Sequence, residues 1–186
     1  KGPRDIKFMS VRFGNVLNSR GSVVPLFVRQ IIKGGPVTVT EGSMSRFFMD
    51  VNKAVELIFQ SFVMAHGGET FVFKMPVMRI GDLAQAVIEM SGREMPIATI
   101  GLRPGEKMYE ELMSEEESSR ALETDELYII LPYYKNVSEA TACYPGTRRA
   151  ITRVYSSSDV PAMSPEEIKA TLQAQWGANL LCPGLG

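Results

Sequence analysis

The chain has 186 residues, 45% of them hydrophobic, and its 20 basic and 21 acidic residues give a formal net charge of −1. This balance excludes a strongly basic surface, so we expect neither nucleic acid nor an anionic membrane as a partner. No apolar run approaches the roughly 20 residues of a membrane-spanning helix, and the first residues lack a signal-peptide pattern, which together predict a soluble, cytoplasmic chain.

Strand and helix patterns alternate through the first part of the chain. Residues 6–12 alternate in polarity like a strand, and glycine, asparagine and serine then break the pattern. Residues 23–32 carry apolar side chains at helical spacing, and the KGGP that follows ends this helix. The VTVT of residues 37–40 predicts a short strand, and the SRFFMD of residues 45–50 places Arg46 at the start of an apolar strand.

The most regular helix pattern covers residues 51–65, with Asp50 as its N-cap. Its side chains form one apolar stripe of the kind that faces a protein core, made of Val51, Ala54, Val55, Ile58, Phe59 and Phe62. A strand at 70–73, a helix at 80–90 and a strand candidate at 96–101 follow. This alternation of strands and helices predicts an α/β fold.

The pattern changes after the segment GLRPGEK. The MYEEL of residues 108–112 predicts a short helix, and the LYIILP of residues 127–132 predicts a strand. Residues 133–163 have weak periodicity and are rich in Tyr, Gly, Ser and Pro, which indicates an extended segment on the surface. The SPEE of residues 164–167 forms a capping box with proline at the first helical position, so it predicts a terminal helix.

Polar side chains and flexible backbone occur together in three segments: RFGNVLNSRGS at 12–22, SRFFMD, and GLRPGEK at 101–107. In the first segment, Gly14 and Gly21 let the backbone approach a ligand closely. Its side chains with hydrogen-bonding groups are Asn15, Asn18, Ser19, Arg20 and Ser22. These groups suit a charged or polar ligand better than they suit a core.

Two arginines strengthen this interpretation. Arg46 and Arg103 stand in segments that lead into helices, and guanidinium groups match phosphate oxygens bidentately. The N-terminus of the first helix adds free N–H groups and the positive end of a dipole. Glu106 can accept hydrogen bonds from ribose hydroxyls. Together these groups predict a site for a nucleoside diphosphate.

Each of these residues also has a simpler explanation. Arg46 can be a surface ion-pair residue, and Arg103 can pair with Glu106 across a turn. Asn15 can stabilise its own loop, as loop asparagines commonly do. The strand at 37–40 can be a plain edge strand. Spacing alone leaves these alternatives open.

The sequence lacks the motifs of common catalytic sites. It has no G-x-G-x-x-G after a strand, no G-x-x-x-x-G-K-[ST], no G-x-S-x-G and no Tyr-x-x-x-Lys. Cys143 and Cys182 are far apart without a C-x-x-C partner, and His66 is the single histidine, so neither a zinc site nor a disulfide is expected. We predict no metal ligand and no catalytic residue in this chain.

Five blocks of the sequence, in this order, resemble the C-terminal half of the UDP-N-acetylglucosamine 4,6-dehydratases, which belong to the extended short-chain dehydrogenase/reductase group. The blocks are VRFGNVLNSRGSVVPLFVRQIIKGGPVTVT, SRFFMDVNKAVELI, GGETFVFKM, RIGDLAQAVIEMSG and GLRPGEKMYEELMSEEE. The resemblance covers residues 6–131, and the pattern that follows is most similar to the inverting enzymes, which also epimerise C5 and make capsule or surface-antigen sugars. It implies the C-terminal portion of an extended Rossmann-type fold, with the last parallel strands and the smaller substrate-binding α/β region.

The resemblance also implies a role for individual residues. It assigns Arg46 and Arg103 to the diphosphate of a UDP-sugar and Glu106 to its ribose. The other implied contacts are Thr38 and Val39 at the uracil, Phe13 near the nicotinamide, and Asn15, Ser22, Val24 and Pro25 around the sugar nucleotide.

By the same resemblance, residues 1–132 form a substrate-binding half with a remnant of the Rossmann sheet, and residues 133–186 form a wrapping segment and a terminal helix. In that family the NADP-binding loop and the catalytic groups lie upstream of RFGN. We therefore expect the whole protein to be an NADP-dependent lyase that acts on a UDP-sugar as a homo-oligomer, and this chain to be inactive alone. The alternatives are a nucleotide-sugar epimerase or retaining dehydratase of the same group, and a non-catalytic UDP-sugar-binding module.

Overall fold

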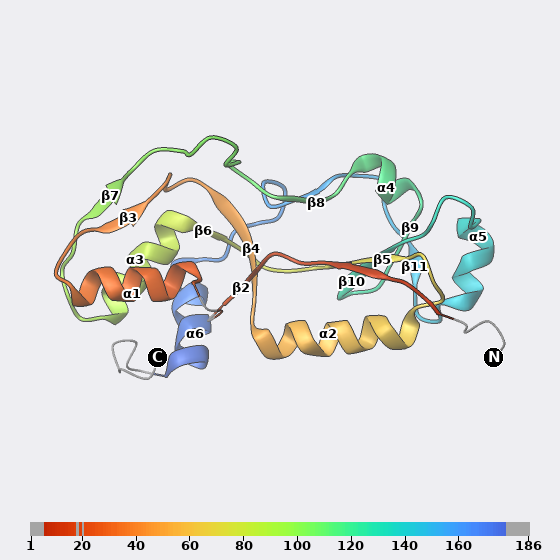
Figure 1. Ribbon diagram of the computed structural model, residues 1–186, viewed down its shortest axis with the longest axis horizontal. Helices are drawn as coiled ribbons and strands as arrows, with labels where there is room; N and C mark the ends of the chain where they lie inside the picture. Colours follow the sequence, from red (N-terminus) through yellow and green to blue (C-terminus); the bar gives the residue numbers. More distant parts are fainter. Residues whose placement is uncertain (1–5, 18, 20, 178–186) are drawn as a thin grey trace. The chain divides into compact units, whose positions relative to one another are not determined.

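The computed structural model describes residues 6–17, 19 and 21–177. These residues form two compact units, and the segments of one unit alternate along the sequence with the segments of the other. Unit 1 consists of residues 6–13, 52–75 and 111–156, and unit 2 consists of residues 14–51, 76–110 and 157–177. Both contain helices and strands (Figure 1), which confirms the predicted α/β fold. A division of the chain after residue 132 stays a prediction from the sequence.

Unit 1 contains a mixed β-sheet with the strand order β1-β5-β10-β9-β11. β1 (Ser10–Arg12) runs parallel to β5 (Thr70–Phe73), while β10 (Leu127–Ile130) is antiparallel to β5 and to β9 (Ala121–Glu123), and β11 (Arg148–Arg149) is antiparallel to β9. β10 is buried on both faces, which explains why its sequence is a continuous apolar run instead of an alternating one. The strand predicted at 70–73 is thus confirmed, and those predicted at 6–12 and 127–132 are confirmed over residues 10–12 and 127–130.

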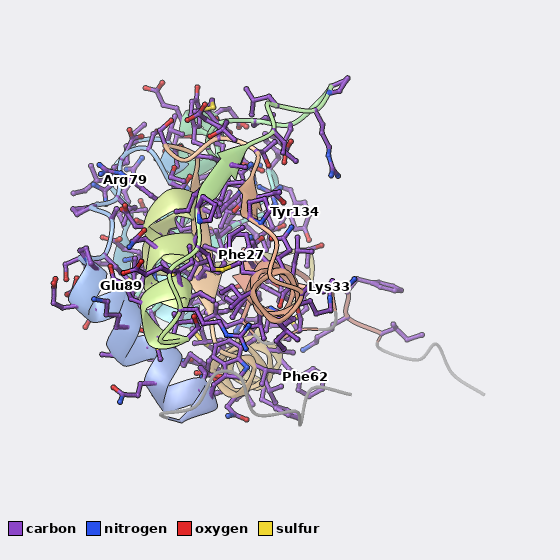
Figure 2. The ribbon with its side chains drawn as sticks, turned by 90° about the vertical axis from the view of Figure 1, so that its left-hand side faces the viewer. Phe27, Lys33, Phe62, Arg79, Glu89 and Tyr134 are labelled. Atoms are coloured by element: carbon purple, nitrogen blue, oxygen red, sulfur yellow. The ribbon has the colours of Figure 1, made fainter. Side chains whose placement is uncertain are left out.

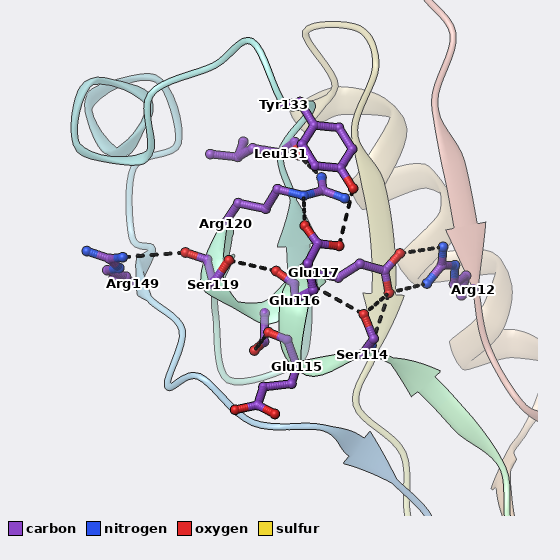
Figure 3. Close-up of polar contacts among 11 residues, drawn as sticks. Arg12, Ser114, Glu115, Glu116, Glu117, Ser119, Arg120, Leu131, Tyr133 and Arg149 are labelled. Carbon is purple, nitrogen blue, oxygen red and sulfur yellow. Dashed lines mark hydrogen bonds and ion pairs between the residues drawn. The ribbon is translucent and has the colours of Figure 1, made fainter.

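A polar network fastens the end of β1 to the acidic segment that follows residue 113. Arg12 donates from Nη1 to Glu117 Oε2 (2.9 Å) and from Nη2 to Glu117 Oε1 (2.8 Å), as Figure 3 shows. Glu117 also completes the capping box of α4 (Glu115–Ser119) with Ser114. The hydrogen bonds from Arg12 lower the pKa of Glu117. Because one carboxylate both caps a helix and holds an arginine, it fixes α4 against β1.

Helix α2 (Val51–Met64) buries a different face from the one that the sequence predicts. Ala54, Leu57 and Ser61 are buried. In contrast, Phe59 is 67% exposed and Phe62 is 71% exposed, and Phe62 projects from the surface in Figure 2. The predicted apolar stripe is therefore confirmed as a buried face at Ala54, and it is wrong for Phe59 and Phe62. Apolar side chains occur around most of its circumference, so periodicity cannot identify the face that packs.

The helix predicted at residues 108–112 is also wrong. β8 (Glu111–Met113) is a strand that pairs antiparallel with β12 (Tyr155–Ser156), a segment far along the chain. Pairing with a distant strand overrides the weak local preference of MYEEL for a helix. Residues 133–163 otherwise contain short elements, including α5 (Val137–Ala140) and the 3₁₀ turn η1 (Thr141–Cys143).

The core of unit 2 lies among α1 (Val23–Ile32), α3 (Ile80–Met90) and α6 (Pro165–Trp176). The inward side chains of these helices include Phe27, Leu83 and Leu172, and Figure 2 labels Phe27 in the interior. The helices predicted at 23–32 and 80–90 are confirmed. The capping box between Ser164 and Glu167 is formed as predicted, and α6 follows it.

The strands of unit 2 form short sheets that present its loops. β3 (Val37–Val39) runs parallel to β7 (Ile97–Thr99), and the 100–110 loop follows β7. β4 (Ser45–Met49) is parallel to β2 (Asn15–Val16) and antiparallel to β6 (Val77–Arg79). This arrangement places Arg46 at the start of the central strand, β4.

Gly14, just before β2, approaches β4 too closely for any side chain. A Cβ at this position would lie 2.5 Å from the Cβ of Phe47 and 2.6 Å from its carbonyl oxygen. We expect Gly14→Ala to lower the free energy of unfolding by at least about 1 kcal/mol, because the backbone of β4 must shift. Urea unfolding followed by circular dichroism measures this effect. Gly35→Ala is the matched control, since a Cβ at Gly35 meets nothing within 4 Å, and equal midpoints for the two variants would contradict the prediction.

Candidate functional site

The guanidinium group of Arg46 is anchored on the loop that carries the other two predicted charged residues. Arg46 Nη1 donates to the carbonyl oxygen of Ser45 (2.7 Å), and Nη2 donates to that of Lys107 (2.6 Å). Arg46 Nε lies 3.6 Å from Glu110 Oε1, and the Arg46 side chain is 12% exposed. Each terminal nitrogen has two hydrogens, so one on each stays available to a ligand beyond these bonds.

Arg103 and Glu106 belong to a tight turn in this loop. The Arg103 N–H donates to Glu106 Oε2 (3.1 Å), and the Glu106 N–H donates to the Arg103 carbonyl oxygen (3.0 Å). Gly105 has a φ of 84°, which a glycine adopts without strain. The Pro-Gly of the RPGEK segment is therefore explained by a turn that exposes Arg103 and orients the carboxylate of Glu106.

The start of the same loop is hydrogen-bonded to the end of β3 and to the residue that follows it. The N–H groups of Ile100 and Gly101 donate to the carbonyl oxygens of Val39 (2.8 Å) and Thr40 (3.1 Å). Thr40 Oγ1 also donates to Glu106 Oε1 (3.3 Å). The structure thus brings Arg46, Thr40 and Glu106 to one loop of unit 2, although they are far apart in the sequence.

A cavity of about 310 Å³ lies at the N-terminus of α1. It is lined by predicted site residues Asn15, Ser22 and Val24, and by Phe48 of β4. Ser22 is the N-cap of α1 but makes no side-chain cap bond, and its buried Oγ has no hydrogen-bond partner among the described residues. A buried hydroxyl without a partner is costly in a folded protein, so it marks a position for a ligand or a water.

Arg46 and Phe48, which lines this cavity, both belong to β4. Side chains two residues apart on a strand point to the same face, so Arg46 and Phe48 share one face of β4. Asn15 is the register partner of Phe48 on β2. The two groups of predicted residues in unit 2 therefore meet the same face of one sheet.

Several predicted residues have internal partners instead. The side chain of Gln30 donates to Thr38 Oγ1 (2.6 Å) and accepts from the Thr38 N–H (3.0 Å). Val39 is 2% exposed, and Pro25 is also buried. Phe13 lies in unit 1, where its ring stacks on Phe73 with centroids 5.7 Å apart. Asn18, Arg20 and Cys182 lie outside the described residues.

The simpler explanations fit part of this geometry. The ion pair expected for Arg46 is present, with Glu110. Among the described residues no ion pair joins the side chains of Arg103 and Glu106, because the Glu106 carboxylate accepts its hydrogen bond from the main-chain N–H of Arg103. Glu110 was not predicted as a site residue, since it is one of two adjacent glutamates and nothing in MYEEL distinguishes them. Burial raises its pKa, against the lowering effects of the Phe47 N–H and of Arg46.

The described residues contain no group of three or more His, Cys, Asp or Glu side chains that could hold a metal ion. Cys143 is exposed, and the Nε2 of His66 lies 3.2 Å from the Cys143 carbonyl oxygen. The site in unit 2 therefore offers cations, a carboxylate, hydroxyls and a helix N-terminus. This chemistry suits an anionic ligand with hydroxyl groups.

Comparison with known proteins gives the following matches. A family model described as polysaccharide biosynthesis protein matches residues 1–132. The chain is 53% identical over 116 residues to the probable polysaccharide biosynthesis protein EpsC of Bacillus subtilis, which covers 60% of this chain and 19% of EpsC. It is 36% identical over 173 residues to a UDP-glucose 4-epimerase of Rickettsia massiliae, which covers 92% of this chain and 51% of that protein.

Among solved structures, Pen from Bacillus thuringiensis matches the fold with a TM-score of 0.83 and 44% sequence identity. This match covers 91% of the chain and 50% of Pen. The chain thus spans about half the length of Pen and of the Rickettsia protein.

Proposed function

Because this chain belongs to the polysaccharide biosynthesis protein family, we propose that it forms the UDP-sugar-binding region of a nucleotide-sugar enzyme in surface polysaccharide synthesis. The reaction that we assign to the whole protein is the NADP-dependent 4,6-dehydration of UDP-N-acetylglucosamine, with inversion at C5. One observation carries the proposal: the Arg46 guanidinium is hydrogen-bonded to the loop that bears Arg103 and Glu106.

In this proposal the diphosphate binds between the two arginines. The hydrogens that remain on the Nη atoms of Arg46 form a fork that matches two phosphate oxygens, and Arg103 is exposed and can supply a second fork. Glu106, oriented by Thr40 and by the Arg103 N–H, accepts hydrogen bonds from the ribose hydroxyls. A carboxylate beside two guanidinium groups thus distinguishes a nucleoside diphosphate from inorganic diphosphate.

In this proposal the sugar of the substrate binds at the N-terminus of α1. The unpartnered Ser22 hydroxyl and the side chain of Asn15 line the cavity there, and both can bond to hydroxyl or amide groups. α1 has 10 residues, so its first N–H groups and dipole add a positive potential. Val39 and Pro25, which are buried, would act through their backbone or by shaping the core.

We propose that this chain does not hold the main dinucleotide-binding loop. Phe13 is the single residue predicted near the nicotinamide, and its ring is stacked on Phe73. The sequence has no glycine-rich phosphate loop after a strand. We therefore assign no step of the reaction to this chain, and we propose that it binds substrate without turning it over.

The second candidate is a UDP-sugar 4-epimerase. It is favoured by the 36% identity, over 92% of this chain, to the Rickettsia massiliae protein named UDP-glucose 4-epimerase. Both candidates bind a UDP-hexose through its diphosphate, so the geometry of Arg46 fits either. A non-catalytic UDP-sugar-binding module is the third alternative, and the sequence upstream of Lys1 in its reading frame would distinguish it.

Isothermal titration calorimetry with UDP-N-acetylglucosamine tests the binding proposal. We expect saturable binding, and much weaker binding of N-acetylglucosamine 1-phosphate, which lacks the nucleoside and the second phosphate. Tighter binding of UDP-glucose than of UDP-N-acetylglucosamine would favour the epimerase. The chain mixed with UDP-N-acetylglucosamine and NADP should form no 4-keto product. An absence of binding contradicts the proposed function, and turnover contradicts the proposed inactivity.

Location and assembly complete the proposal. We propose that the protein is cytoplasmic and forms a homo-oligomer, as its sequence and its resemblance predict. Within the part of the chain that the structure describes, no helix has the length and apolar character needed to cross a bilayer.

A further inference from the structure

Glu110, at the end of the 100–110 loop, forms an ion pair with the candidate phosphate-binding arginine, Arg46. Its Oε1 lies 3.6 Å from Arg46 Nε, and its Oε2 accepts a hydrogen bond from the Phe47 N–H (3.4 Å). The Glu110 side chain is 29% exposed. Among the described residues, Arg46 is the charged side chain that acts on Glu110. Phe47 contacts Glu110 through its backbone N–H, and Lys107 contacts Arg46 through its carbonyl oxygen. The carboxylate therefore acts on the Nε side of the guanidinium and leaves the Nη atoms directed elsewhere.

Ser157 forms hydrogen bonds with the backbone of both Glu110 and Ser45. It is 2% exposed, and its Oγ accepts a hydrogen bond from the Glu110 N–H (2.9 Å). The Ser157 N–H donates in return to the Glu110 carbonyl oxygen (2.8 Å). Ser157 Oγ also lies 2.9 Å from Ser45 Oγ and donates to the Ser45 carbonyl oxygen (3.2 Å). That same carbonyl accepts from Arg46 Nη1 (2.7 Å).

We infer that Glu110 and Ser157 are positioning residues that hold Arg46 in place for the diphosphate of a sugar nucleotide. This inference rests on the proposed function. One buried hydroxyl fixes both main-chain segments, and the carboxylate then fixes the guanidinium between them. An arginine that is already ordered loses less side-chain entropy when it binds phosphate, so its affinity is higher.

The sign of the expected effect separates this role from simple electrostatics. A carboxylate near a diphosphate repels it, so charge alone predicts that removing Glu110 strengthens binding. A positioning role predicts the opposite, because Arg46 loses its fixed orientation. Burial raises the pKa of Glu110, and a bound diphosphate would raise it further by like-charge repulsion. Binding should therefore take up protons at acidic pH through Glu110.

The experiment measures the affinity of the chain for UDP-N-acetylglucosamine in single and double variants. We expect Glu110→Ala to weaken binding by about threefold to thirtyfold, and to have no further weakening effect in an Arg46→Ala background. Calorimetry at acidic pH in buffers of different ionisation enthalpy should show proton uptake that Glu110→Gln reduces. Both phosphates of this ligand are esterified and keep only strongly acidic protons, so they do not titrate at mildly acidic pH and do not contribute to that signal.

Ser157→Ala should weaken binding in the same range, and Ser157→Thr should restore it because the hydroxyl is kept. Ser157 lines a cavity of about 480 Å³. Glu111→Ala is the matched control, since Glu111 is the adjacent glutamate and is exposed. In the ligand-free chain, NMR should show faster hydrogen exchange at Arg46 Nε in Glu110→Ala than in this control.

The outcomes separate the inference from the proposed function. If the wild-type chain binds and Arg46→Ala weakens binding, but Glu110→Ala binds equally or more tightly, the inference is wrong and the proposed function stands. An equal loss from Glu110→Ala with and without Arg46 would also overturn it, as would unchanged exchange at Arg46 Nε. A variant that unfolds is replaced by Glu110→Gln, for which the proton-uptake result decides.

Discussion

Replacing Arg46 with alanine is expected to weaken the binding of UDP-N-acetylglucosamine by about 1.5–3 kcal/mol, or about ten- to 150-fold. Arg46 would lose charge-assisted hydrogen bonds to phosphate oxygens, and its 12% exposed side chain leaves little room for water to replace them. Titration calorimetry of the two proteins measures the difference. The large effect is expected because a guanidinium fork cannot be reproduced by neighbouring backbone groups.

Two further variants sharpen this test. Arg46→Lys keeps the charge without the fork, so it should recover only part of the affinity. Arg29→Ala is the control, because Arg29 is an exposed arginine on α1 in the same unit. Arg103→Ala should weaken binding of the same ligand by a similar amount, about 1.5–3 kcal/mol. Unchanged affinity in Arg46→Ala, with binding intact, would favour the explanation that Arg46 serves only its ion pair with Glu110.

Replacing Glu69 with glutamine is expected to destabilise unit 1 by on the order of 3 kcal/mol at neutral pH. Glu69 is 1% exposed and lies just before β5. Its Oε1 accepts hydrogen bonds from Lys135 Nζ and Tyr144 Oη (both 2.7 Å), and its Oε2 accepts one from the Gly67 N–H (2.7 Å). Burial alone would raise the pKa of Glu69, but these hydrogen bonds lower it from 4.5 to about 2.

The sign of the pH dependence follows from this lowered pKa. Glu69 is ionised in the folded chain down to pH about 2, whereas in the unfolded chain it takes up a proton near pH 4.5. Its contribution to stability is therefore complete above pH 4.5 and is lost as the pH falls from 4.5 to about 2. Urea unfolding at a series of pH values should show this loss in the wild type and a flatter profile in Glu69→Gln.

Glu139→Gln is the matched control for this prediction. Glu139 lies on α5, in the segment that Glu69 holds through Lys135 and Tyr144, and it is exposed. We expect its profile to follow that of the wild type. If Glu69→Gln unfolds at the same urea concentration as the wild type at pH 7, the buried carboxylate does not stabilise the fold as its hydrogen bonds indicate.

Local features of the sequence were enough for the helices of unit 2. α1 and α3 have an apolar stripe that ends in glycine, and α6 has a capping box, so each signal lies within the helix or beside it. The Pro-Gly of residues 104–105 is likewise a local turn signal, and the structure has a turn there between Arg103 and Glu106. Such signals need no knowledge of the rest of the chain.

Other features needed contacts between distant segments. β8 is a strand because β12 pairs with it, and α2 buries Ala54 and Leu57 because of what the rest of unit 1 packs against it. Lys135, which lies in the segment 133–163 predicted to be extended on the surface, donates a hydrogen bond to the carboxylate of Glu69. No short window of sequence contains both partners of any of these contacts.

The same distinction holds for the candidate site. The sequence by itself determined which residue types are present to hold an anion, since the arginines, the acid and the helix N-terminus can be identified from their local context. Only the tertiary structure decided that Arg46 lies against the 103–110 loop, and that Glu110 and Ser157 hold it there. The reason is physical: side-chain chemistry and turn preference are local properties, whereas the position of a side chain depends on how separate strands and loops pack.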